Sequence, residues 1–172
     1  HEDWRYDNFR KQFPKLYWPV SFSGIHFFPT LMVYLGCLPI YPAIVEPVNA
    51  FGILDVLAVI VTFVAVMIEL IADEQMRSFG KIKKPGEIMN KGLWAYSRHP
   101  NYFGEILFWW GLYLFAIAAN PEFWWTGIGA LAITVMFFTA SIPMIDKRSL
   151  ERRPGYAEHM KKVPAIIPWK KA

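Results

Sequence analysis

Long apolar runs alternate with short polar segments along this chain. Residues 16–45 contain no Asp, Glu, Lys or Arg, and neither do residues 106–121 or 123–145. Asp55 is the only charged residue between Pro47 and Glu69. Apolar runs of roughly 18 residues or more are long enough to cross a bilayer as a helix. The pattern therefore predicts four membrane-spanning helices, at about 20–44, 50–73, 103–119 and 122–145, with a loop at 74–102 and a tail at 146–172.

The expected fold class is all-α, an integral membrane helical bundle in a single domain, 1–172, that ends in an amphipathic tail. The first span contains Pro29, Pro39 and Pro42, and proline inside a helix removes a backbone donor, so we expect this span to be kinked or broken. Pro100 suits the first position of the third helix, with the preceding His99 as its cap. The tail pattern predicts a short helix, a Pro-Gly turn and a second short helix.

Composition and charge agree with a membrane protein and add an orientation. Hydrophobic residues make up 55% of the chain and charged residues 19%. All 18 Lys and Arg lie within residues 1–15, 77–98 and 147–171, whereas the other two connections carry only Glu46 and Glu122. Because positive charge collects on the cytoplasmic side, we expect both ends of the chain and the 74–102 loop to lie there. Topology accounts for the basic segments, so we expect the lipid bilayer, and no nucleic acid, as a partner.

Some classes of protein are excluded by what the sequence lacks. The single cysteine, Cys37, cannot form an internal disulfide, and no Cys/His spacing typical of a metal site occurs. The first residues contain no apolar core of a signal peptide. Their composition is typical of a loop that leads into a span. We expect this chain to lack N-terminal helices of a longer protein. No GxGxxG after a strand and no Walker loop occurs, so a nucleotide would bind in a pocket of the membrane domain.

Polar chemistry is concentrated in SRHPNYFGE, residues 97–105, where the third span begins. The N-terminal end of a helix attracts anions, and the guanidinium of Arg98 suits a phosphate or carboxylate. Asn101 and Glu105 are four residues apart on one helix face, with Tyr102 beside them. Glu105 lies within the span, where an ionisable group needs a cavity or a partner. The stretch predicts an anion-binding site at the mouth of the third span, with ordinary interfacial anchoring as the alternative.

Two further clusters lie at the same predicted level. Glu69 and Asp73 close the second span on one helix face, either as part of a binding site or as an ion pair or hydrogen-bond network with Arg98, Lys83 or Lys84. Asp146 follows the fourth span and precedes a basic tail, most of which we expect to face solvent and lipid headgroups.

The segments KKPGE, GLWAYSRHPNYFGE and ERRPGYAEHMKKVPAIIPW resemble the C-terminal domain of the steroid 5-alpha-reductase superfamily, and most closely an uncharacterised branch of integral membrane proteins within it. The resemblance covers nearly the whole chain. It implies a larger helical bundle, of which this chain matches the later four spans. It also implies an NADPH-dependent reductase of an activated carbon–carbon double bond in a lipid or sterol-like enone.

The resemblance also implies site residues. Asp73 matches an acidic cofactor contact, Lys83 and Lys84 a basic pair near the phosphates, and Asn101 a nicotinamide or ribose contact. Together with the polar cluster, the expected cofactor-binding residues are Asp73, Lys83, Lys84, Tyr96, Arg98, His99, Asn101, Tyr102, Glu105, Asp146 and Lys162. No catalytic acid is assigned, because the family's carbonyl-polarising groups come largely from the earlier helices.

Two other functions stay open. Membrane methyltransferases of the isoprenylcysteine carboxyl and phospholipid types share an Arg-His-Pro-x-Tyr-x-Gly core, here Arg98 to Gly104, which holds S-adenosylmethionine with two adjacent glutamates past the last span. This chain has Ile145-Asp146 there, with one acid. The remaining alternative is a non-enzymatic lipid-binding protein or a structural subunit of a larger membrane assembly.

Overall fold

The computed structural model describes residues 4–168. Four helical stretches in it are long and apolar enough to cross a membrane, Tyr17–Ile44, Ile53–Ile82, Pro100–Ala119 and Pro121–Arg152. Among residues 4–168 there is no β-strand. Most large side chains on the outer faces of these helices are apolar and exposed, among them Val56, Ile60 and Phe63, which suits a lipid environment. The predicted all-α membrane bundle is confirmed.

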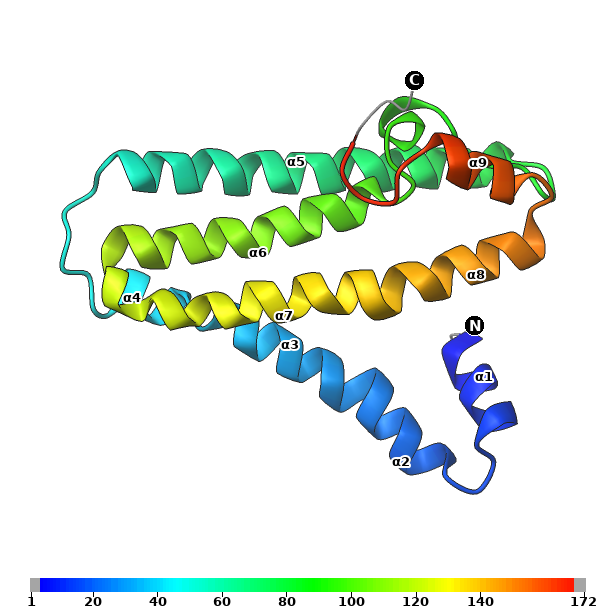
Figure 1. Ribbon diagram of the computed structural model, residues 1–172, viewed down its shortest axis with the longest axis horizontal. Coiled ribbons are helices and arrows are strands. Elements are labelled where there is room, and N and C mark those ends of the chain that lie inside the picture. Colours follow the sequence, from blue (N-terminus) through cyan, green and yellow to red (C-terminus); the bar gives the residue numbers. More distant parts are fainter. Residues whose placement is uncertain (1–3, 169–172) are drawn as a thin grey trace.

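The first spanning stretch is interrupted, as its prolines predicted. After α1 (Trp4–Gln12) it consists of α2 (Tyr17–Ser21), a π-helical turn η1 (Phe22–Phe27), α3 (Phe28–Cys37) and α4 (Ile40–Ile44). In Figure 1, α2 and α3 diverge from the rest of the bundle and α1 turns back toward α8. The phenol of Tyr6 in α1 lies 3.1 Å from Nε2 of His26 in η1, so α1 is tied to the π-helical turn.

Helices α5 (Ile53–Ile82) and α6 (Pro100–Ala119) form a tightly packed pair (Figure 1). Ala58, Ala65 and Ala72, seven residues apart, are completely buried. On α6 a Cβ added at Gly111 would lie 2.3 Å from Oγ1 of Thr62. Small residues at such an interface let two helix backbones approach closely, and this pair holds the beginning of α6 against α5.

The last spanning stretch is one long rod made of η3 (Pro121–Gly127), α7 (Ile128–Met136), a π-helical turn η4 (Phe137–Ser141) and α8 (Ile142–Arg152) (Figure 1). It crosses α3 around a small core of Met32, Ile133 and Phe137. At the crossing, a Cβ added at Gly129 would lie 2.0 Å from the carbonyl oxygen of Leu35. The two backbones therefore meet directly.

Two helix ends differ from the sequence prediction. Within the predicted loop 74–102, α5 continues as helix to Ile82 and α6 already begins at Pro100, as the proline indicated. The predicted fourth span, 122–145, continues as α8 to Arg152. Apolar residues mark the part of a helix that suits lipid, but a helix continues into polar sequence until a residue breaks it.

The connection between α5 and α6 folds onto the end of α5. Its single 3-10 turn, η2 (Gly92–Ala95), is held by two hydrogen bonds. The indole N–H of Trp94 donates to the Ala72 carbonyl at 2.9 Å, and the Leu93 N–H donates to Oε1 of Gln75 at 3.0 Å. After α8, Gly155 at φ 88° allows the predicted Pro-Gly turn, and α9 (Tyr156–Lys162) is the second short helix of the tail.

Candidate functional site

The carboxylate of Asp146 on α8 is the centre of a buried polar cluster, which we call the tail clamp (Arg98, His99, Asp146 and Tyr156). Oδ2 accepts from Nη2 of Arg98 at 2.7 Å, and Oδ1 accepts from the Tyr156 hydroxyl at 2.7 Å and lies 3.0 Å from Nε2 of His99. The side chains of Arg98, His99 and Asp146 are only 9%, 5% and 8% exposed. A buried charge is stable only when it is paired and hydrogen-bonded, and this carboxylate meets both conditions.

Arg98 also binds the tail itself. Its Nη1 donates to the Val163 carbonyl at 2.6 Å and to the Met160 carbonyl at 3.4 Å. These carbonyls lie at the C-terminal end of α9, where a cation is favourable because the last helical carbonyls lack partners within the helix. The guanidinium is thus shared between α8 and α9.

Backbone hydrogen bonds complete the docking of the tail. The N–H groups of Arg98 and His99 donate to the carbonyls of Pro164 and Ala165 at 2.9 and 3.0 Å. The hydroxyl of Ser97 donates to the Ala165 carbonyl at 3.1 Å. The SRHP stretch is therefore the place where the C-terminal segment attaches to the start of α6.

Three predicted cofactor ligands take part in the tail clamp. Arg98, His99 and Asp146 were expected to contact an anionic cofactor, and the structure places their polar groups against each other and the tail. Proximity of Arg98 and Asp146 was not foreseen, since 48 residues separate them in sequence. The alternative expectation, that Arg98 pairs with Glu69, is replaced by the bond to Asp146.

Below the clamp, the predicted cluster continues along α6. The ring of Tyr102 stacks on His99 with centroids 5.2 Å apart and touches Phe137 at 4.7 Å. The side-chain oxygen of Asn101 is buried and has no hydrogen-bond partner within residues 4–168. Gly104 packs on the backbone of Glu69, so half-buried Glu105 and Glu69 lie at one level of the α5–α6 pair. An unpaired oxygen and two carboxyl groups suit a ligand that donates hydrogen bonds.

The remaining predicted ligands lie on the surface. Asp73 at the end of the predicted second span, Lys83 and Lys84 after α5, Tyr96 after η2 and Lys162 at the end of α9 are all exposed. The Lys84 N–H donates to Oε2 of Glu87 at 2.9 Å, which shapes the KKPGE turn. None of these five residues donates a hydrogen bond to the Asn101 oxygen, and their predicted cofactor contacts stay predictions.

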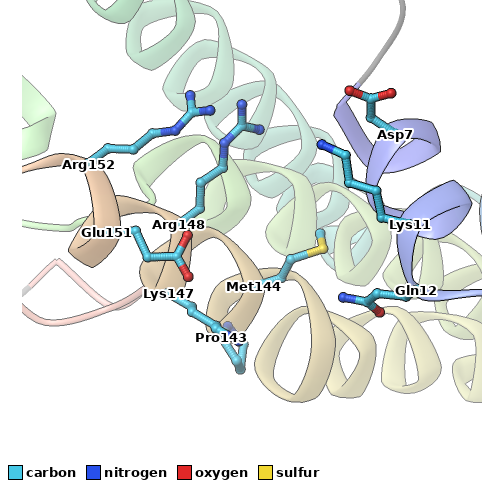
Figure 2. Close-up of a pocket in the computed structure, with 9 residues that line it drawn as sticks. All are labelled: Asp7, Lys11, Gln12, Pro143, Met144, Lys147, Arg148, Glu151 and Arg152. Carbon is cyan, nitrogen blue, oxygen red and sulfur yellow. The ribbon is translucent and has the colours of Figure 1, made fainter.

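A cavity that the sequence did not indicate lies between α1 and α8. This α1–α8 pocket has a volume of about 690 Å³ and is lined by Asp7, Lys11, Gln12, Pro143, Met144, Lys147, Arg148, Glu151 and Arg152. Figure 2 shows Lys11 of α1 and Arg148 of α8 extending into the same space. Four cationic and two acidic side chains give the lining a net positive charge. The pocket requires α1 to fold back beside α8, which no local sequence signal indicates.

The clamp and the pocket use different residues of one helix. Asp146 binds α6 and α9, while its neighbours Lys147 and Arg148 line the α1–α8 pocket. The clamp therefore fixes the helix that carries three of the four cations of the pocket.

His159 on α9, whose charge is affected by Arg98 and Asp146 of the tail clamp, makes the stability of the fold sensitive to acid. Burial, with Arg98 and Arg153 nearby, lowers the pKa of His159, and Asp146 opposes this only in part. A lowered pKa means that the unfolded state binds more protons between the folded pKa and about 6.5. We expect the His159 contribution to be complete above pH 6.5 and to be lost as pH falls toward the folded pKa. Thermal unfolding of wild type and His159→Gln at pH 7.5 and 5 measures it, and an equal acid effect in both would contradict the assignment.

Comparison with known proteins finds a family and a relative. Residues 1–163 match the family described as Protein of unknown function (DUF1295). An uncharacterized protein of the fission yeast Schizosaccharomyces pombe is 31% identical over 189 residues, an alignment that covers 97% of this chain and 55% of that protein. This chain thus spans about half the length of that relative. No solved structure matches. Because the family match includes all four spanning helices and the tail clamp, the chain belongs to the DUF1295 family.

Proposed function

We propose that this protein is a membrane reductase that uses NADPH to reduce an activated carbon–carbon double bond in a lipid or sterol-like enone. The observation that carries the proposal is the cationic α1–α8 pocket, whose volume of about 690 Å³ is within the range of small-molecule sites. The resemblance of KKPGE and GLWAYSRHPNYFGE to the steroid 5-alpha-reductase superfamily supports the same reaction. NADPH, when bound, would supply a hydride to the β-carbon, and a proton at the α-carbon would complete the saturated product.

The donor set of the pocket suits the anionic half of such a cofactor. The pocket is lined by four cationic side chains, Lys11, Lys147, Arg148 and Arg152. Their N–H groups would bind the pyrophosphate and the 2′-phosphate. S-adenosylmethionine carries a sulfonium and an ammonium against one carboxylate, so a positively charged lining disfavours it. This charge argument favours the reductase over the methyltransferase.

The α6 cluster suits the uncharged half. The buried, unpaired oxygen of Asn101 can accept from a carboxamide N–H or a ribose hydroxyl, and leaving it without a partner costs about 1–3 kcal/mol. Glu105, one helical turn further along α6, offers a second acceptor. We retain Asn101 and Glu105 as proposed contacts, and assign Arg98, His99 and Asp146 to holding α8 in place.

Ligand-dependent thermal stability of the purified protein tests the proposal. NADPH at about 100 times its dissociation constant would stabilise the fold by roughly 2.7 kcal/mol, and we expect this shift with NADPH but not with S-adenosylmethionine. A shift with S-adenosylmethionine alone would establish the methyltransferase reading. No shift with NADPH, NADH or S-adenosylmethionine would favour the lipid-binding or structural alternative.

Variants that remove a cation of the α1–α8 pocket test where the phosphates of NADPH bind. Lys147→Ala and Arg152→Ala each remove one cation from the α1–α8 pocket, and we expect each to weaken NADPH binding about tenfold, near 1.4 kcal/mol. Lys161→Ala is the matched control, because Lys161 is exposed and pairs with Glu158. Weaker binding in a Lys83→Ala/Lys84→Ala variant, with Lys147→Ala unchanged, would move the phosphates to the KKPGE turn.

A further inference from the structure

One wall of the α1–α8 pocket is a segment of α8 that lies, in sequence, between two residues of the tail clamp. Residues 147–152, which we call the cationic wall, supply three of the four pocket cations, Lys147, Arg148 and Arg152. Asp146 comes directly before this wall, and Tyr156 follows it after a turn. The Tyr156 hydroxyl donates to Oδ1 of Asp146 at 2.7 Å. This bond closes residues 146–156 into a ring, so the cationic wall is held at both of its ends.

The far end of the cationic wall depends on the residues that follow it. Arg152 is the last residue of α8 and lies six residues beyond Asp146, a rise of about 9 Å. The last carbonyls of a helix lack partners within it, and helix ends open readily unless other groups hold them. The next turn is supported from outside, because a Cβ added at Gly86 of the KKPGE turn would lie 3.4 Å from Cδ of Pro154. The position of Arg152 is thus set by the turn and by Tyr156 after it.

Tyr156 is fixed by the docked tail as well as by Asp146. It is only 4% exposed, and the centroid of its ring lies 5.8 Å from that of His159. Further along the tail, Nη1 of Arg98 donates to the Val163 carbonyl at 2.6 Å, and Val163 is buried. Because α9 connects Tyr156 to this docking point, release of the tail would also move the hydroxyl that bonds to Asp146.

We propose that Tyr156 is a positioning residue for the α1–α8 pocket, and that docking of the C-terminal tail and binding of a phosphate-bearing ligand favour each other through the bond from Tyr156 to Asp146. The inference rests on the proposed function for the identity of that ligand. Tyr156 does not line the pocket, so it acts through the cationic wall. Coupling between two binding events is reciprocal, so a docked tail raises the affinity for the ligand and a bound ligand holds the tail in place.

Tyr156→Phe tests the first half of this coupling, because it removes only the hydroxyl. The dissociation constants of NADPH and of inorganic pyrophosphate are measured by isothermal titration calorimetry on the purified protein in detergent. We expect each to rise about fivefold, the lower end of usual couplings between sites. A purely structural role of Tyr156 would lower the thermal midpoint and leave both constants unchanged. Tyr34→Phe is the matched control, since Tyr34 is an exposed residue of α3 outside the clamp and the pocket lining.

The reciprocal measurement needs no variant. NADPH or pyrophosphate at about 100 times its dissociation constant should slow trypsin cleavage after Lys162, at the end of α9, about fivefold in the wild type. Cleavage after Lys91, an exposed residue of the connection between α5 and α6, should keep its rate and is the internal control. In Tyr156→Phe the protection of Lys162 by either ligand should be lost.

The outcomes separate this inference from the proposed function. Unchanged dissociation constants in Tyr156→Phe, or equal cleavage after Lys162 with and without bound ligand, would overturn the inference while NADPH binding still supports the reductase. Protection of the tail by pyrophosphate without any NADPH-induced thermal shift would overturn the proposed function and retain the coupling. Absence of binding by both probes would overturn both, since each requires an anion at the pocket cations.

Discussion

Asp146→Ala is expected to release the C-terminal tail and to cost about 3–5 kcal/mol of stability, the usual range when one partner of a buried ion pair is removed. In the variant, the side chains of Arg98, His99 and Tyr156 each lose the bond that they make to the Asp146 carboxylate. In the wild type, burial together with the bond to Asp146 raises the pKa of Tyr156 to about 12, so its hydroxyl is a donor, and the variant removes its Asp146 acceptor. The Asp146 carboxylate on α8 thus links the Arg98–His99 segment before α6 with Tyr156 at the start of α9.

Two measurements check the Asp146 prediction. Thermal unfolding reports the global loss, and limited trypsin digestion after Lys162, at the end of α9, reports opening of the tail. The rate of this cleavage should rise about a hundredfold for a 3 kcal/mol change. Glu158→Ala is the matched control, because Glu158 forms an exposed pair with Lys161, and such pairs contribute about 0–1 kcal/mol. Asp146→Ala and Glu158→Ala variants of equal stability would show that the clamp does not hold the tail.

Gly129→Ala is expected to separate α3 from α7. The added Cβ would lie 2.0 Å from the Leu35 oxygen, 2.3 Å from the Leu35 carbonyl carbon and 2.6 Å from the Gly36 nitrogen. All three are backbone atoms, which can move only with their helix. Overpacking of a core usually costs about 1–3 kcal/mol and occasionally more, and we expect this methyl group to reach or exceed the upper value.

A matched substitution isolates the packing effect at Gly129. Gly80→Ala also places alanine within a helix, and its Cβ would have nothing within 4 Å. Alanine is favoured over glycine in a helix by about 0.5–1 kcal/mol, so Gly80→Ala should be neutral or stabilising. Thermal unfolding of both variants in detergent gives the comparison. A Gly129→Ala variant as stable as wild type would mean that α3 and α7 are not in contact through their backbones.

The spanning helices were predictable because bilayer crossing depends on local composition. Residues 123–145 lack charge and fold as expected, and Pro100 marked the start of α6 because proline suits a first helical turn. The extension of α5 to Ile82 was missed, since its polar residues resemble a loop while containing no helix breaker before Gly80.

The candidate site was predictable only in part, because its contacts join distant segments. The SRHPNYFGE stretch was identified correctly as a polar centre, but the partner of Arg98 depends on how α8 packs against α6. Lys11 and Lys147 line one pocket because the chain turns back at residues 13–16, after α1. The sequence marks this turn only by Pro14, which does not indicate where α1 will pack. Local chemistry identified the polar side chains, and tertiary packing decides which of them face a ligand.

The long separation between the partners of the tail clamp has a consequence for biosynthesis. Arg98 leaves the ribosome 48 residues before Asp146 and 65 residues before Val163. While the third and fourth spans enter the membrane, Arg98 is therefore a cation without its later partners, and positive charge beside a span directs its orientation during insertion. The same guanidinium binds the 160–163 carbonyls only after that segment has been synthesised, so the tail clamp is completed later than the synthesis of the third and fourth spans.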